Sequence, residues 1–234
     1  MRLDKFVCKS TELTRKEAIH NIHLGAVCVN GNVIKNESVQ VHENNTVLLS
    51  GIKLQARDSR YIMMHKPAGT VCSNVDEIYP SLFNYLDVDN ASELHIAGRL
   101  DADTTGLVLI TDDGRWSFNI TLPNNGCRKV YRVHLSQAIS TEQRQDLVAK
   151  FECGLQLQGE KELTRPAKLD IITSTEVLLT ITEGKFHQVK RMFAAVGNRV
   201  VTLHREQIGE VCLDLGVGQW RYLSKNEVES FNNN

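Results

Sequence analysis

The sequence predicts an α+β protein of two domains: a small N-terminal α/β domain, residues 1–58, and a larger domain, residues 59–234, with a mixed, mainly antiparallel sheet flanked by helices. Short branched apolar runs recur along the chain between turn residues and a few short amphipathic stretches, which is the pattern of strands interspersed with helices. A polar segment without periodicity, residues 51–60, is typical of a linker between the two parts.

The N-terminal part begins with helices and continues into a hairpin. Thr14 and Glu17 have the spacing of a capping box and predict a helix that ends at Gly25. Asn30-Gly31 stands between two apolar runs, which is the strongest short-range signal for a β-hairpin. Residues 46–49 are predicted to form a further strand.

One face of the helix after Thr14 carries basic and histidine side chains. Lys16, His20 and His23 lie together at i, i+4 and i+7, opposite the apolar face. The residues alone fit a solvated helix face, and two histidines without a third ligand do not predict a metal site.

The larger part alternates strands with short helices. Strands are predicted at 61–66, 107–110, 128–135, 169–172, 177–182 and 200–209. Helices are predicted at 115–121, at 189–196 and between a capping box at 140–143 and residue 151. The few prolines and the period-two runs favour a mainly antiparallel sheet.

A polar loop leads directly into the most apolar of these strands. It consists of Gly98-Arg99-Leu100-Asp101-Ala102-Asp103-Thr104-Thr105-Gly106 and continues into Leu107-Val108-Leu109-Ile110. A loop that leans on a buried strand is where catalytic groups often lie, although Asp and Thr are also ordinary loop residues.

These segments resemble the signature of the pseudouridine synthases in the branch that modifies ribosomal RNA, and the chain is most similar to the RsuA family. The motifs are Gly-Arg-Leu-Asp with Thr-Thr-Gly-Leu at 98–107, Lys-Pro-Ala-Gly at 66–69, Lys-x-Tyr at 129–131 and His-Gln-Val-Lys-Arg at 187–191. The N-terminal part resembles the alpha-L motif, a small RNA-binding domain. The resemblance implies an RNA-binding domain at 1–58 and, at 59–234, a catalytic domain that converts a uridine of small-subunit ribosomal RNA to pseudouridine.

The resemblance also assigns catalytic roles. Asp101 matches the family's essential aspartate, for which attack on the base or the sugar and proton abstraction from the sugar have each been suggested. Tyr131 matches the tyrosine that packs against the target base; a core aromatic with a bonded hydroxyl is the alternative. Lys190 stands where the family usually has an arginine that pairs with the aspartate. Helical spacing puts Lys190 beside the apolar stripe and Arg191 opposite, facing water. Because lysine lacks the arginine fork, Arg191 stays a second candidate for the pairing.

The resemblance further implies a set of residues that contact RNA. In the N-terminal domain these are Arg2, Arg15, Lys16, His20 and His23. In the catalytic domain they are Arg99, which suits a phosphate, together with Lys129 and Arg191. Lys129 lies on the same predicted strand face as Tyr131, which favours a base-stacking role for that face.

The reaction sets the chemistry that the residues must supply. It breaks the N-glycosidic bond, turns the base and rejoins it through carbon without redox change, so we expect no cofactor and no metal. The uridine must leave its stack to reach Asp101, and a nearby cation keeps a partly buried carboxylate ionised. The expected partner is small-subunit ribosomal RNA or a partly assembled small ribosomal subunit, and we expect a monomer.

Three alternatives stay open. A non-catalytic RNA-binding or ribosome assembly protein would keep the basic faces without an ionised Asp101. A synthase acting on large-subunit ribosomal RNA would share the same motifs. A metal-dependent phosphoesterase would use Asp101, Asp103, Asp112 and Asp113, although a strand of about four residues, roughly 13 Å long, separates the two pairs.

Composition fits a globular protein, with 41% hydrophobic and 24% charged residues. The net charge is −1, but residues 1–60 carry +3 and the remainder −4, and residues 185–205 hold five basic residues and no acidic one. A local RNA-facing surface is therefore compatible with the near-neutral chain. The six cysteines form no C-x-x-C pair. The chain also has no apolar run near the roughly 18 residues of a membrane span and no apolar signal core. These observations predict a cytoplasmic protein with reduced thiols. Residues 232–234 are expected to fray.

Overall fold

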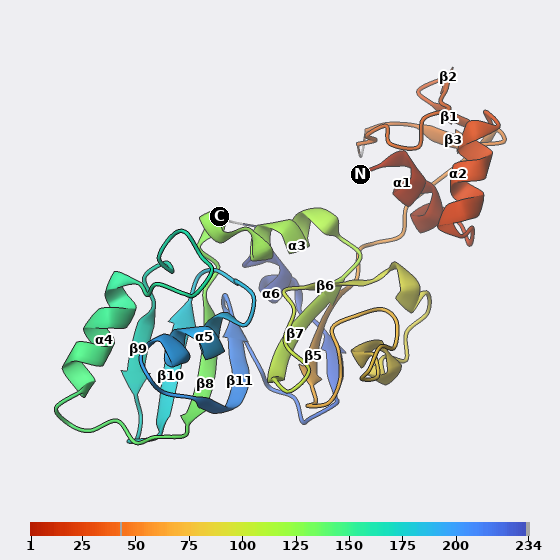
Figure 1. Cartoon of the computed structure of the whole chain (residues 1–234). Helices are drawn as coiled ribbons and strands as arrows, with labels where there is room; N and C mark the ends of the chain where they lie inside the picture. Colours follow the sequence, from red (N-terminus) through yellow and green to blue (C-terminus); the bar gives the residue numbers. More distant parts are fainter. Residues whose placement is uncertain (43, 233–234) are drawn as a thin grey trace. The chain divides into compact units, whose positions relative to one another are not determined.

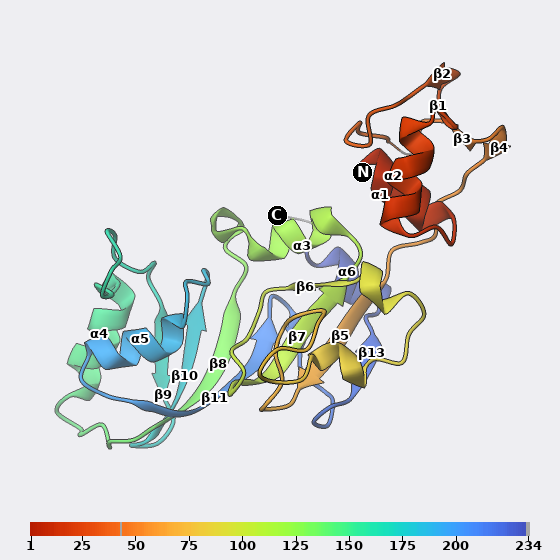
Figure 2. The ribbon, with the colours of Figure 1, turned by 45° about the vertical axis from the view of Figure 1, so that its right-hand side comes forward.

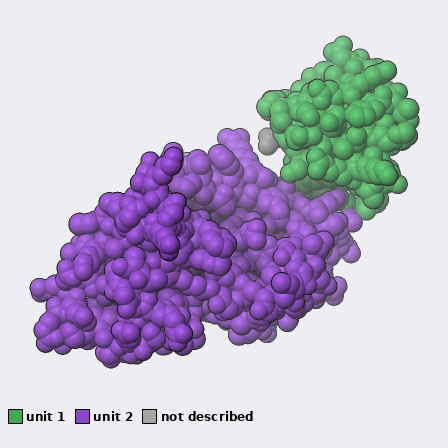
Figure 3. Space-filling view, in the orientation of Figure 1, with its two compact units in different colours: residues 1–58 green, residues 59–234 purple. Residues whose placement is uncertain are grey.

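The computed structural model describes residues 1–42 and 44–232, whose helices and strands are shown in Figure 1. The chain divides into two compact units, Met1–Asp58 and Ser59–Asn234 (Figure 3). The expectation of fraying at residues 233 and 234 lies outside the described residues.

The first unit packs two helices on a small sheet. The helices are α1 (Leu3–Ser10) and α2 (Arg15–His23), and the sheet has the order β2 (Asn32–Val33), β1 (Val27–Val29), β3 (Val47–Leu49), β4 (Ile52–Lys53). The capping box at Thr14 is confirmed, because its side chain accepts from the Glu17 N–H and the Glu17 carboxylate accepts in return. The hairpin at Asn30-Gly31 is confirmed, with both residues at positive φ.

One expectation for this unit was wrong. Residues 51–60 are not all linker, because Gly51 turns the chain at a φ of +83° and β4 then pairs with β3. The strand is only two residues long and both are exposed, so the sequence shows no apolar run there. The core of the unit consists of side chains from both helices and the sheet: Leu3, Val7, Ala18, Ile22, Val27, Val41 and Val47.

The second unit is built on a nine-stranded sheet. Along its main path the strands are β13 (Trp220–Tyr222), β5 (Tyr61–Lys66), β7 (Thr105–Thr111), β11 (Val200–Ile208), β8 (Lys129–Leu135), β10 (Glu176–Ile181) and β9 (Lys168–Ile171), with β6 (His95–Ala97) on β7 and β12 (Val211–Cys212) on β11. Among the described strands only the β7–β11 pair is parallel, so the predicted mixed, mainly antiparallel sheet is confirmed.

Helices cover the two faces of this sheet at different places. α4 (Arg144–Cys153) and α5 (Gln188–Ala195) lie against the β8–β10–β9 half, as Figure 2 shows, and share a core with its inward side chains. α3 (Gly114–Thr121) and α6 (Lys225–Glu229) belong to a second core against β5 and β7, on the opposite face. The split follows from strand alternation, which sends Met64 into the first core and Met63 into the second.

The helix after residue 140 begins later than predicted. Gln143 caps α4 without a side-chain hydrogen bond, and Ser140 lies a turn earlier, where its N–H donates to Gln143 Oε1 at 3.2 Å. The capping-box pattern therefore marks a turn that precedes the helix. Within the described residues, every helix is too short or too polar to cross a membrane.

Candidate active site

The polar loop at 98–104 ends where β7 meets β11. β11 pairs in parallel with β7 only through His204 and Arg205, opposite Thr105 and Gly106, while β6 occupies the same edge of β7 farther along. Gly106 has a φ of +111°, and a Cβ there would lie 2.3 Å from the Arg205 carbonyl oxygen. Glycine is required because the two backbones approach so closely.

A buried lysine at the end of β5 binds the backbone of the loop. Lys66 is 0% exposed at the end of β5, and its ammonium donates to the carbonyl oxygens of Ala102 at 3.2 Å and Thr104 at 2.9 Å. Gly69 N–H also donates to the Ala102 carbonyl at 2.8 Å. Burial lowers the pKa of Lys66. The Lys-Pro-Ala-Gly segment therefore acts as a brace for the loop backbone.

A buried arginine ties the same loop to β8. Arg205 is 1% exposed, and its guanidinium donates to the carbonyl oxygens of Gly98 and Leu107 at 2.8 Å each. It also donates to the Tyr131 hydroxyl at 3.3 Å. One side chain thus holds both ends of the loop and the tyrosine in fixed relation.

Asp101 is the half-buried carboxylate at the centre of this arrangement, with 28% of its side chain exposed. Lys190 Nζ donates to Asp101 Oδ2 at 3.0 Å and to Asp103 Oδ1 at 2.6 Å. His187 Nε2 lies 3.4 Å from the other oxygen of Asp101. Burial alone lowers the pKa of Lys190, but its bonds to the two aspartates outweigh this and raise the pKa, so the ammonium stays charged at neutral pH.

Tyr131 and Lys129 share the inner face of β8, as predicted, and both are buried. Tyr131 pairs with Arg205, which pairs with Gly106, so the three residues form one row across adjacent strands that spans about 10 Å. Lys129 is 6% exposed and donates to the Cys127 carbonyl, and burial lowers its pKa. Its position does not support the predicted contact with RNA.

Arg191 differs from its prediction. Only 25% of its side chain is exposed, because the excursion after α4 brings Glu160 to 3.0 Å from its guanidinium. Lys185 binds the same carboxylate at 3.0 Å. Helical spacing located Arg191 on the side of the helix opposite the apolar stripe, facing water, but a long-range contact with Glu160 covers that side. Arg191 is therefore engaged elsewhere, and Lys190 is the cation beside Asp101.

The other predicted RNA-contacting residues lie at the surface, and three of them lie beside carboxylates of the protein. Arg2 and Arg15 both donate to Asp4, a carboxylate that is 0% exposed. Burial alone raises the pKa of Asp4, but the bonds from the two arginines lower it below its ordinary value. His23 Nε2 lies 2.9 Å from a Glu37 oxygen. The remaining three are exposed: Lys16, His20 and Arg99.

The aspartates of the phosphoesterase alternative do not come together. Asp112 accepts from the Arg60 guanidinium at 2.9 Å, and Asp113 caps α3 by accepting from the N–H groups of Arg115 and Trp116. Both follow the far end of β7, whereas Asp101 precedes its start. The two pairs therefore have separate partners at opposite ends of one strand.

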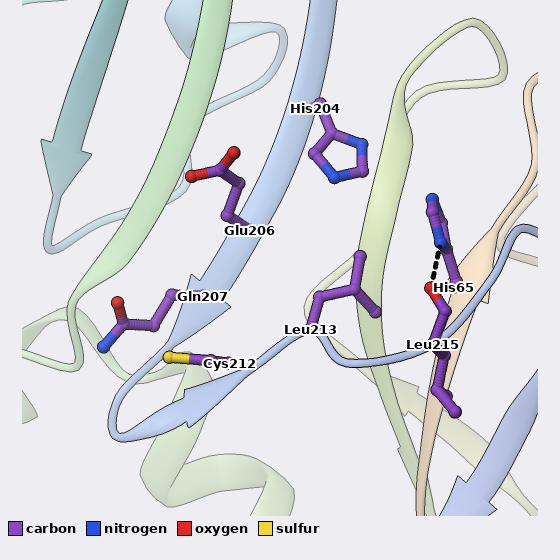
Figure 4. Close-up of a pocket in the computed structure, with 7 residues that line it drawn as sticks. All are labelled: His65, His204, Glu206, Gln207, Cys212, Leu213 and Leu215. Atoms are coloured by element: carbon purple, nitrogen blue, oxygen red, sulfur yellow. Dashed lines mark hydrogen bonds between the residues drawn. The ribbon is translucent and has the colours of Figure 1, made fainter.

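Two pockets flank the sheet near this loop. A cavity of about 250 Å³ has Asp103, Lys190 and Thr105 at its polar end and continues along Ala68 and residues 200–203. A second cavity, of about 390 Å³, is shown in Figure 4 and is lined by His65, His204, Glu206, Gln207, Cys212, Leu213 and Leu215. It lies on the other face of the sheet, since His204 and Glu206 alternate with the inward Arg205. It is therefore separate from Asp101.

A carboxylate held beside a half-buried cation within a braced loop, on a mixed sheet with a small basic N-terminal unit, is what the resemblance predicted. The chain belongs to the RNA pseudouridylate synthase family, whose model matches residues 60–195, and an S4 domain model matches residues 1–47. These matches confirm the family and the class of enzyme expected from the sequence.

Its relatives are named more specifically. The chain is 50% identical to the ribosomal small subunit pseudouridine synthase A of Vibrio cholerae over 98% of this chain and 99% of the relative. It is 46% identical to the protein of the same name from Escherichia coli, with the same coverage. A solved structure of a pseudouridylate synthase is 45% identical, covers 99% of both chains and superposes with a TM-score of 0.71.

Sequence reasoning did not assign roles to three residues of the site. Arg205 counted only as one of five basic residues near the C-terminal strand, Lys66 only as part of a turn motif, and His187 only as part of a helix motif. A charged residue at an inward strand position was the available signal for both cations. His187 carried no such signal, because its approach to Asp101 depends on a left-handed backbone, with φ at +47°.

Proposed function

We propose that this chain isomerises one uridine of small-subunit ribosomal RNA to pseudouridine, with residues 59–234 as the catalytic domain and residues 1–58 as an RNA-binding domain. The names of relatives about half identical over nearly the full length support this substrate. The observation that carries the proposed mechanism is the Asp101–Lys190 pair, held at 3.0 Å on a loop whose backbone is braced at several points.

In this proposal Asp101 acts on the flipped nucleotide as an ionised carboxylate. Lys190 contacts this carboxylate at 3.0 Å, and the brace from Lys66 and Arg205 removes the need to order the loop during the reaction. The N1–C1′ bond breaks and a C5–C1′ bond forms. The proton at C5 leaves to solvent and N1 takes up a proton, so the overall change is an isomerisation.

In this proposal the detached base packs against Tyr131. It lies in the same strand row as Gly106, at the base of the loop, and Arg205 fixes its hydroxyl at 3.3 Å. Tyr131 is 7% exposed, so in this proposal the extruded base packs against the small part of the ring that the protein leaves open, and the tyrosine needs no further ordering.

The N-terminal unit supplies affinity in this proposal. Arg15, Lys16, His20 and His23 of its predicted basic face are all exposed. Of the predicted residues, Arg2, Arg15 and His23 lie beside carboxylates that hold them in place. In the catalytic unit, Arg99 is exposed two residues before Asp101 and suits a phosphate. We propose that the chain acts as a monomer in the cytoplasm, on naked ribosomal RNA or on a partly assembled small subunit.

The test is release of tritium from uridine labelled at C5. Wild-type protein is incubated in parallel with naked small-subunit RNA, with partly assembled small subunits and with large-subunit RNA. We expect release of one equivalent from a small-subunit substrate and none from large-subunit RNA.

Release from large-subunit RNA alone would contradict the substrate assignment. RNA binding without release from any of the three substrates would instead favour the non-catalytic binding or assembly protein. The assay therefore separates the proposal from both remaining alternatives.

A further inference from the structure

Phe186 presents an apolar ring to solvent beside the candidate active site. It precedes α5, is 76% exposed, and stacks on the imidazole of His187 with ring centroids 3.8 Å apart and planes at 23°. A large aromatic ring is usually buried, because burial of its surface is favourable. An exposed ring that is already stacked on one side leaves its other face available.

The backbone that carries this ring is fixed. Glu183 is 7% exposed and accepts from Arg165 N–H at 2.9 Å and from Gln188 Nε2 at 2.8 Å. The Phe186 carbonyl accepts from the Arg191 guanidinium at 3.0 Å. Phe186 is thus displayed by a braced loop, and a partner that stacks on it has little loop ordering to overcome.

The position of the ring relates it to the reacting nucleotide. His187 contacts Asp101 at 3.4 Å and stacks on Phe186, so the Phe186 ring lies one aromatic layer from the catalytic carboxylate. If one base of an RNA strand lies at Asp101, the next base along the strand can reach the Phe186 ring.

The charges around the ring favour a base over a phosphate. The three cations nearest to it in sequence face three carboxylates: Lys185 and Arg191 both bind Glu160 at 3.0 Å, and Lys190 binds Asp101 and Asp103. Their charge is therefore largely compensated within the protein. A neutral aromatic surface between compensated charges suits the π-face of a nucleobase.

We propose that the Phe186–His187 stack is a platform for the nucleobase next to the target uridine, which holds the RNA strand while the uridine is extruded. The inference rests on the proposed function, since it needs an RNA substrate at Asp101. Stacking tolerates any base, so the platform contributes affinity and placement more than sequence selection.

The experiment measures single-turnover tritium release at increasing protein concentration, which separates RNA affinity from the rate at saturation. Phe186→Leu retains apolar bulk and removes the π-face; Phe186→Tyr retains the π-face. We expect the concentration for half-maximal rate to rise about tenfold or more in Phe186→Leu, with the saturated rate within about threefold of wild type. Phe186→Tyr is expected to match wild type.

Phe118→Leu is the matched control, since Phe118 is also exposed, at 57%, but lies on α3. It is expected to behave as wild type. The inference is overturned if Phe186→Leu binds as tightly as wild type, if only its saturated rate falls, or if Phe186→Tyr shows the same loss as Phe186→Leu. Release by wild type in the same experiment tests the proposed function separately, so failure of the platform and failure of the activity are distinguishable.

Discussion

Replacement of Lys190 by methionine removes the cation beside Asp101 and retains most of the side-chain bulk. Two unit charges 3.0 Å apart attract by about 5.5 kcal/mol at an effective dielectric of about 20 and by about 1.4 kcal/mol in bulk water. Both side chains are 28% exposed, so an intermediate loss of about 2–3 kcal/mol is appropriate. In the proposed mechanism the ammonium holds the reacting carboxylate in position, so this loss falls on the transition state, and we expect the saturated rate of Lys190→Met to fall about 30- to 150-fold.

The assay is single-turnover tritium release at saturating protein and neutral pH, with RNA affinity measured on the same preparations. Lys190→Arg is the matched control, because it retains the charge and is expected to stay within about fivefold of wild type. Affinity should change little in either variant, because the ammonium is already engaged by two carboxylates. The reasoning is refuted if Lys190→Met reacts within threefold of wild type, or if Lys190→Arg is as slow as Lys190→Met.

Three further predictions test the brace, the acid stability and the RNA surface. Gly106→Ala drives a Cβ into the Arg205 backbone, so we expect a loss of about 4 kcal/mol or more in the free energy of unfolding, measured by urea titration. The pKa of Glu227 is lowered to about 2, mainly because its carboxylate accepts a hydrogen bond from Arg221. The ionised carboxylate therefore stabilises the fold fully above the unfolded pKa of about 4.3, and this contribution is lost as pH falls toward 2. Glu227→Gln should therefore lower the thermal midpoint at pH 7 and flatten its fall between about pH 4.3 and 2, whereas an unchanged acid profile would contradict the ion pair. Lys16→Ala should weaken RNA binding and reduce the slope of log affinity against log salt by about one, with the saturated rate unchanged; an unaltered slope would remove Lys16 from the interface.

Local patterns predicted much of the catalytic loop and its surroundings. The glycines at 98 and 106, the apolar strand after them and the helical stripe around Lys190 depend on rules that act over a few residues. The structure joins the loop and the helix through the 3.0 Å contact between Asp101 and Lys190, 89 residues apart. The resemblance supplied that pairing, because spacing alone gave only the side of the helix on which Lys190 lies.

Long-range contacts account for what the sequence did not reveal. Arg191 lies on the outer side of its helix, yet Glu160 from a distant excursion binds it. Lys129 occupies the predicted strand face, but it is 6% exposed and its ammonium bonds the Cys127 carbonyl. Arg205 gained its role only when β11 paired between β7 and β8, which no local pattern indicates. In each case the burial of the side chain depends on how distant parts of the chain pack, which no local pattern shows.

The central claim is that Asp101, and not its neighbour Asp103, acts on the nucleotide. Both carboxylates bind Lys190, but Asp101 is 28% exposed within the site and Asp103 is 72% exposed. The decisive measurement is tritium release from C5-labelled small-subunit RNA by Asp101→Asn and Asp103→Asn, each with RNA binding confirmed. We expect Asp101→Asn to lose activity by at least about a thousandfold and Asp103→Asn to stay within about fivefold of wild type. Substantial release by Asp101→Asn, or its loss only in Asp103→Asn, would contradict the account.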